Sequence, residues 1–223
     1  MDRVTEVPVE PWTEAEFRQV ARVGATELNI ILQDDIVTKC VEASFASIGV
    51  FQEVVKETCR LAGVLAPVPE VLDISDTDLV DRAIAEKASQ YAVRHQRALE
   101  SIAAGNISTT SKEGLKPLFL PYYLINVVLE GGYDGIATGM RRAVIQERIR
   151  GQHHRGGDVR GSDMSNLLHN LAKLQANKKI TPPIIDYDRT SKLLQIVDST
   201  FYFFLRHADL KAIAEEIPNP LED

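Results

Sequence analysis

The stretch PPIIDYDRTSKLLQIVD, residues 182–198, holds two short apolar runs separated by a polar turn, in a chain whose other patterns are helical. The runs at Ile184–Tyr187 and Leu193–Val197 have the length of β-strands, and they are joined through the turn-like sequence DRTS. These residues predict a single β-hairpin. Because an isolated hairpin is only marginally stable in water, we expect it to pack against the neighbouring helices.

Three helices are predicted before the hairpin, within LFLPYYLINVVLEG (118–131), GIATGMRRAVIQERIRG (135–151) and SDMSNLLHNLAKLQAN (162–177). The third has apolar residues at helical spacing and Ser162 or Asp163 as its N-cap. A last helix is predicted within STFYFFLRHADLKAIAEEI, directly after the hairpin. Three helices followed by a two-stranded wing is the element order of a winged-helix domain, a relative of the helix-turn-helix DNA readers.

The residues at 12–63 predict a compact helical bundle. Thr13 and Glu16 fit a capping box that begins the first helix. Asp34 is placed to cap the second helix. The third helix, within VFQEVVKETCRLAG, is expected to close at Gly63, because glycine commonly follows the last residue of a helix.

A connector and a long helix separate these two parts. VLAPVPEVLDIS contains two prolines, and the long helix after it is expected to end at Gly105, before the polar stretch NISTTSKEG (106–114). We therefore divide the chain into a helical bundle at 1–65, a connector and long helix at 66–116, and a winged-helix-like domain at 117–223. The expected fold class is mainly α with one β-hairpin.

The composition is that of a folded protein, with 44% hydrophobic and 26% charged residues. A net charge of −7 argues against non-specific binding of nucleic acid or membrane by the surface as a whole. Cys40 and Cys59 have no partner residues at metal-ligand spacing, so we expect buried thiols of a cytoplasmic protein. The N-terminus lacks signal-peptide features, and no apolar run approaches the roughly 20 residues of a membrane span.

Positive charge is concentrated at 141–180, which carries nine basic and three acidic residues, a net charge of +6, so that the rest of the chain carries −13. A basic region of this kind suits contacts with phosphate, because each such contact releases a counterion. The third predicted helix would be the recognition element, and the wing would add cations. The candidate nucleic-acid-binding residues are Arg155, Arg160, Asn166, Lys173, Lys178, Lys179, Arg189 and Lys192.

Other interpretations of the same residues stay open. A charged helix face can simply be solvated, and winged helices also serve as protein-interaction modules. His153 and His154 are adjacent in a glycine-rich loop, so they project in different directions and make poor joint metal ligands. His95 is expected to be a packing or surface residue rather than a base. The chain contains no phosphate-binding loop or other catalytic motif, so we expect no catalytic residue and no metal site.

Two stretches carry a family resemblance. Residues 7–63, which begin VPVEPWTEAEF and end KETCRLAG, resemble the helical lid that follows the nucleotide-binding core of AAA+ and related STAND P-loop ATPases. In such lids a strand ends near the sequence Pro-Trp, and a helix that contains Glu-Leu and a stripe of apolar residues follows it. A second helix, a turn of small residues and a further apolar helix complete the lid. IIDYDRTSKLLQIVDSTFYFFLRH is similar to the winged-helix end of these ATPases, where the wing runs into VD, an aromatic-rich helix and LR.

The resemblance implies the C-terminal half of a P-loop ATPase. Since the phosphate-binding loop and the acidic Mg²⁺-binding strand are not in this sequence, ATP and Mg²⁺ are expected only in a core outside it, with no cofactor in this chain. Lids of this kind often place an arginine at the start of the third helix. SIGVFQEVV has none there, so no nucleotide-sensing residue is assigned.

The expected function is that of a non-catalytic regulatory portion of an oligomeric P-loop ATPase, which couples nucleotide state to the binding of a partner or nucleic acid. The expected partners are the ATPase core or other protein subunits, and DNA, but no membrane. Two alternatives remain: a free-standing DNA-binding regulator, and a protein-interaction scaffold that presents PLFLPYYLINVVL and FYFFL to a partner.

Overall fold

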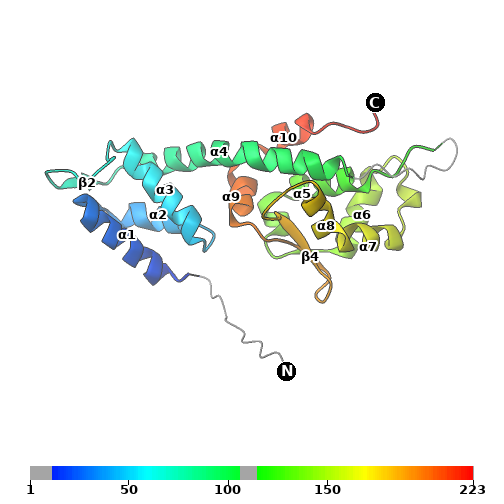
Figure 1. Cartoon of the computed structure of the whole chain (residues 1–223), viewed down its shortest axis with the longest axis horizontal. Helices are drawn as coiled ribbons and strands as arrows, with labels where there is room; N and C mark the ends of the chain where they lie inside the picture. The colour runs from blue at the N-terminus through cyan, green and yellow to red at the C-terminus, as the bar shows by residue number, and fades with distance from the viewer. Residues whose placement is uncertain (1–11, 106–114, 223) are drawn as a thin grey trace, which may run out of the picture. The chain divides into compact units, whose positions relative to one another are not determined.

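The structure, a computed structural model, describes residues 12–105 and 115–222 (Figure 1). It is mainly helical with a few short strands, as the sequence predicts. The chain divides into two compact units, residues 1–87 and 88–223, and the division falls inside the long helix α4 (Asp78–Ala103). The polar stretch at 106–114 lies outside the described residues. No helix in the described part of the chain is both long and apolar enough to cross a bilayer.

The two ends of α4 belong to different cores, which explains why the division falls within it. Leu79 packs against a cluster that contains Ile30 and Ile74. Leu99 and Ile102 are fully buried in the core of residues 88–223. α4 therefore contributes apolar side chains to the cores of both units.

The first unit consists of helices and one pair of strands. Its elements, in chain order, are α1 (Glu14–Leu28), β1 (Ile30–Leu32), α2 (Asp34–Glu42), α3 (Ile48–Leu61), β2 (Leu72–Ile74) and the start of α4. β1 and β2 pair in parallel, with Ile31 opposite Asp73. This pair was not predicted, because three residues are too few to show a strand periodicity. The two cysteines, Cys40 and Cys59, are free and buried here.

The predicted capping box is present at the start of α1. The Thr13 hydroxyl accepts a hydrogen bond from the Glu16 N–H at 3.4 Å, and the Thr13 N–H donates to the Glu16 carboxylate at 2.8 Å. Trp12 packs on Phe17 with 6.0 Å between ring centroids, which adds a hydrophobic staple across the cap. Gly63 has φ +83° just past α3, as expected of a helix-terminating glycine.

One predicted cap in this unit is wrong. The N-cap of α2 is Gln33, and Asp34 is the first residue inside the helix. The Asp34 carboxylate instead forms an ion pair of 2.6 Å with Arg18 of α1. The competing charge on the neighbouring helix explains why this aspartate does not cap its own.

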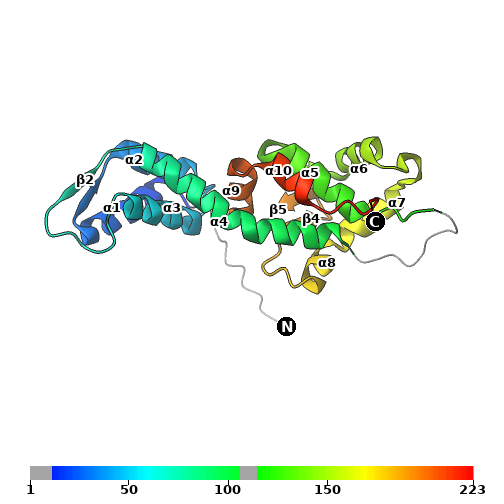
Figure 2. The same ribbon diagram turned by 90° about the horizontal axis from the view of Figure 1, so that it is seen from above.

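The second unit contains the predicted hairpin and a third strand. After the end of α4 its elements are α5 (Leu120–Ile136), β3 (Met140–Arg141), α6 (Arg142–Gln152), the 3₁₀ turn η1 (Gly156–Asp158), α7 (Gly161–His169), α8 (Leu171–Asn177), β4 (Ile185–Asp188), β5 (Leu193–Ile196), α9 (Ser199–His207) and α10 (Leu210–Glu216). β4 and β5 form the antiparallel hairpin, with Ile185 opposite Ile196. β3 pairs with the other edge of β5, so the strand order is β3-β5-β4. Figure 2 shows α8 beside this hairpin.

The predicted helices of this unit differ from the observed ones in four places. The second predicted helix, 135–151, begins only at Arg142, because Met140 and Arg141 form β3. The third predicted helix is broken at Asn170 into α7 and α8. Its N-cap is Arg160 rather than Ser162 or Asp163, and the Asp163 carboxylate accepts from the Arg160 N–H at 3.1 Å. The last predicted helix is likewise broken, and Asp209 caps its second part, α10. At the second break the Asp209 carboxylate accepts from the Ala212 N–H at 3.1 Å, which satisfies a backbone group that a continuous helix would satisfy internally.

The core of the second unit is built around α5 and α9. Leu124 and Ile125 of α5, with Phe201 and Phe204 of α9, are fully buried in it. The segments PLFLPYYLINVVL and FYFFL therefore place most of their large side chains in the core. His95 is also fully buried there, against Phe201 and Phe204, so it is a packing residue.

Candidate nucleic-acid interface

One side of α7 is polar and the other is core. Met164 and Leu168 are buried, whereas a set of polar side chains at spacings of three and four residues lies on the opposite side. We call this set the polar stripe: Ser162, Ser165, Asn166 and His169. Ser162, Asn166 and His169 are exposed and Ser165 is half-buried.

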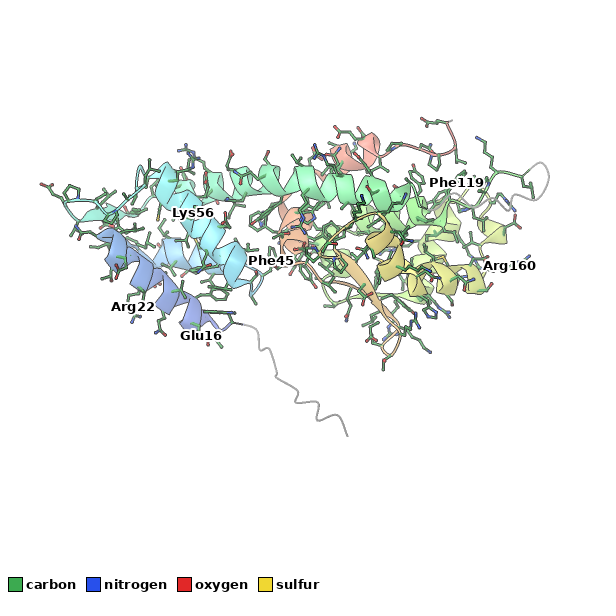
Figure 3. All side chains as sticks on the ribbon, viewed as in Figure 1. Glu16, Arg22, Phe45, Lys56, Phe119 and Arg160 are labelled. Carbon is green, nitrogen blue, oxygen red and sulfur yellow. The ribbon has the colours of Figure 1, made fainter. Side chains whose placement is uncertain are left out.

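Arginines from three segments surround the polar stripe. Arg142, the first residue of α6, donates to the Ser165 hydroxyl at 2.6 Å. Arg189, in the hairpin turn, donates to the carbonyl oxygen of His169 at 3.1 Å. Arg160 is exposed at the N-terminal end of α7, where Figure 3 labels it. The sequence placed Arg142 in the basic region but did not select it, since only the fold brings the start of α6 beside α7.

The predicted lysines lie on α8 and the hairpin rather than on α7. Lys173 is exposed on α8, Lys178 and Lys179 follow its last residue, and Lys192 is in the hairpin turn. Their side chains make no hydrogen bond or ion pair with the residues that the structure describes. They are therefore available to an anionic partner.

Arg155 has partners inside the protein. Its guanidinium forms an ion pair of 2.6 Å with Asp158 and donates to the carbonyl oxygen of Lys116 at 2.7 Å. These contacts hold the loop between α6 and α7 against the segment before α5. Of the predicted binding residues, Arg155 and Arg189 thus both donate side-chain hydrogen bonds within the fold, and Arg155 also forms an ion pair.

The adjacent histidines hold the same loop. The Arg155 N–H donates to Nδ1 of His153 at 2.7 Å, so the proton of His153 is on Nε2, which donates to the Leu118 carbonyl oxygen at 2.6 Å. His154 Nδ1 lies 3.0 Å from the Tyr123 hydroxyl. Burial lowers the pKa of both histidines. Within the described residues no three His, Cys, Asp or Glu side chains form a group that could hold a metal ion.

The hairpin turn is fixed by Asp188. Its carboxylate accepts from the Ser191 hydroxyl at 2.6 Å and from the N–H groups of Thr190 and Ser191 at 2.8 and 3.2 Å. The hydrogen bonds from these donors lower the pKa of Asp188, and the one from the Ser191 hydroxyl has the largest effect. Because the turn is held by its own aspartate, Arg189 and Lys192 are presented from a defined backbone.

No aromatic ring of Phe, Tyr or Trp is exposed across residues 161–197, all of which the structure describes. Tyr187 is the single such residue in this range, and it is buried beside His169 with 5.7 Å between ring centroids. The surface consequently offers charges and hydrogen-bonding groups, without a platform on which an unpaired base could stack.

Comparison of the chain with protein-family models, curated proteins and solved structures finds no match. The function proposed below therefore depends on the geometry of these residues.

Proposed function

We propose that residues 88–222 form a winged-helix module that binds duplex DNA through α7, α8 and the β4–β5 hairpin. The observation that carries the proposal is the polar stripe of α7 with Arg142 and Arg189 on its borders. The element order α5, β3, α6, α7–α8, β4, β5, with β5 in the middle of the sheet, supports it. In such a module a helix lies in the major groove while flanking cations contact the backbone.

A duplex suits this surface better than a single strand does. Proteins that bind single strands stack the bases on exposed aromatic rings, and residues 161–197 expose none of Phe, Tyr or Trp. The major groove of B-form DNA admits a helix, whereas that of A-form RNA is too narrow for side chains to read. We therefore favour DNA over RNA.

The residues of the surface divide into two chemical roles. The amide of Asn166 is suited to a bidentate contact with adenine, and this type of contact distinguishes bases. Lys173, Lys192 and Arg189 supply positive charge from α8 and the hairpin turn, so we assign to them the contacts with phosphate that raise affinity at low salt.

The salt dependence of binding tests the proposal. Fluorescence anisotropy with a labelled duplex should show binding that weakens as salt rises. The variant K173A/K192A should lower the slope of log K against log salt by about two. The control is K56A, which removes an exposed lysine on α3 and should leave the slope unchanged (Figure 3). Absence of duplex binding by the wild-type chain, or equal effects of both variants, would refute the proposal.

We further propose that the first unit is a lid-like regulatory part of a P-loop ATPase, with the nucleotide-binding core outside this sequence. The order α1, β1, α2, α3, β2, α4 and the resemblance of residues 7–63 support this, although the part before Trp12 lies outside the described residues. Large exposed apolar side chains suit a surface that contacts another protein: Val23, Ile31, Leu65, Val71 and Leu72 are 38% to 82% exposed.

Equilibrium dialysis with ATP tests the proposal that the nucleotide-binding core lies outside this sequence. The chain should retain no ATP in equilibrium dialysis with Mg²⁺ and should release no phosphate from it. A chain that binds and hydrolyses ATP unaided would contradict the assignment. If the chain captured a protein subunit but never bound DNA, the scaffold alternative would replace the DNA-binding one.

A further inference from the structure

Gln175 of α8 is fully buried, and its amide is satisfied by the hairpin. Its Nε2 donates to the carbonyl oxygens of Ile185 at 2.7 Å and Leu171 at 3.3 Å. Its Oε1 accepts from the N–H groups of Ile184 at 2.9 Å and Ile185 at 3.4 Å. Removing such a buried partner leaves backbone groups unsatisfied, so the amide is a fixed connection between α8 and β4.

The Gln175 amide lies beside the edge of the sheet, where a further strand would pair with β4. β4 lies at the edge of the sheet, since the strand order is β3-β5-β4. The Val197 N–H donates to the Ile184 carbonyl oxygen at 3.1 Å, so the backbone groups of Ile185, the next residue, face away from β5. Gln175 both donates to and accepts from Ile185, as a neighbouring strand would. It thereby closes this edge of the sheet.

A second contact holds the other end of the hairpin. Arg189 donates to the His169 carbonyl oxygen at 3.1 Å, and the His169 ring lies against Tyr187. The hairpin is therefore attached to α8 at its base and to α7 at its turn. The contact at the base is buried and the one at the turn is exposed.

We propose that Gln175 is a positioning residue that sets the hairpin turn, with Arg189 and Lys192, relative to the polar stripe of α7. The inference rests on the proposed duplex binding, in which these two sets of residues must contact one DNA molecule together. Methionine has nearly the same length as glutamine but cannot donate or accept as the amide does. Q175M therefore removes the connection while the volume of the side chain is kept.

The position of the hairpin can be measured without DNA. Spin labels at Ala172→Cys on α8 and Thr190→Cys in the hairpin turn report the distance between the two elements. The native cysteines are buried, so the labels attach to the introduced ones. With Gln175 present we expect one narrow distance distribution, and with Q175M a broad one. Q195M is the control, because it makes the same replacement at an exposed position of β5.

Duplex affinity then tests whether this position matters. Q175M should weaken duplex binding about tenfold, while Q195M should leave it within about twofold. Ile213→Ala, a core truncation on α10, controls for lost stability and should likewise leave the affinity unchanged. A narrow distance distribution in Q175M, or an unchanged Kd despite a broad one, would overturn the inference. If the wild-type chain bound no duplex, the proposed function would fail, and the spin-label distance alone would decide whether Gln175 positions the hairpin.

Discussion

His95 of α4 and Thr200 of α9 form a hydrogen bond of 3.0 Å inside the core of residues 88–222. The Thr200 hydroxyl donates to Asp198 at 2.7 Å, and Asp198 also forms an ion pair of 2.7 Å with Arg94. Because the hydroxyl donates its proton to Asp198, it accepts from Nε2 of His95, which leaves Nδ1 without a proton. Nδ1 has no hydrogen-bond partner among the residues that the structure describes. The network joins α4 to Asp198, the N-cap of α9.

Stability should fall on acidification because of His95. Burial lowers its pKa to about 4 in the folded protein, against 6.5 as its ordinary value. The unfolded chain therefore binds the proton at a higher pH, and stability present above pH 6.5 is lost as the pH falls toward 4. The difference corresponds to about 3 kcal/mol. Urea unfolding of wild type and H95Q across this range should show a smaller pH dependence in the variant, and an equal pH dependence would contradict this origin.

Two arginine replacements should separate a structural role from a binding role. R155A removes the ion pair with Asp158 and the hydrogen bond to Lys116, so we expect a loss of about 1 kcal/mol in the free energy of unfolding. R160A removes an exposed side chain and should change stability by only about 0.5 kcal/mol or less. Under the proposed function R160A should instead reduce the salt dependence of duplex binding. Equal stability losses in the two variants would contradict this division.

The capping box of α1 should be measurable through the single tryptophan. T13A removes the hydroxyl that accepts from Glu16 and should cost about 1 kcal/mol. T26A, which removes an exposed hydroxyl that donates within the same helix, is the matched control and should have a much smaller effect. Trp12 packs on Phe17, so its fluorescence reports unfolding of the first unit. A T26A loss as large as that of T13A would show that the box is not the cause.

Two glycines should respond to alanine in opposite directions. Gly24 is exposed in the middle of α1 and a Cβ there would meet nothing within 4 Å, so G24A should stabilise by about 0.5–1 kcal/mol. Gly132 has φ 55° and ψ −158° at the kink of α5, and a Cβ would lie 3.3 Å from Leu210. G132A should destabilise by about 1–3 kcal/mol. Thermal unfolding of both variants measures these changes in stability. A G132A variant as stable as wild type would mean that the backbone at the kink adopts another conformation at no cost, which contradicts the prediction.

Short-range signals in the sequence were enough for the start of α1, the end of α3 and the hairpin. Thr13 with Glu16 predicted the beginning of α1, and Gly63 predicted the end of α3, because caps depend on residues within one turn. The two apolar runs around DRTS predicted β4 and β5, since strand length and turn composition are local properties. The basic character of residues 141–180 was likewise visible without coordinates.

Long-range pairing decided the rest. β1 and β2 meet across about forty residues, and the two residues of β3 become a strand only by pairing with β5. Asn170 interrupts a helix whose apolar spacing continues past it, so the break could not be found from periodicity. No local pattern marks Gln175 as the partner of Ile185, or Arg142 and Arg189 as neighbours of α7. A sequence specifies which side chains can bond, whereas packing decides which of them meet.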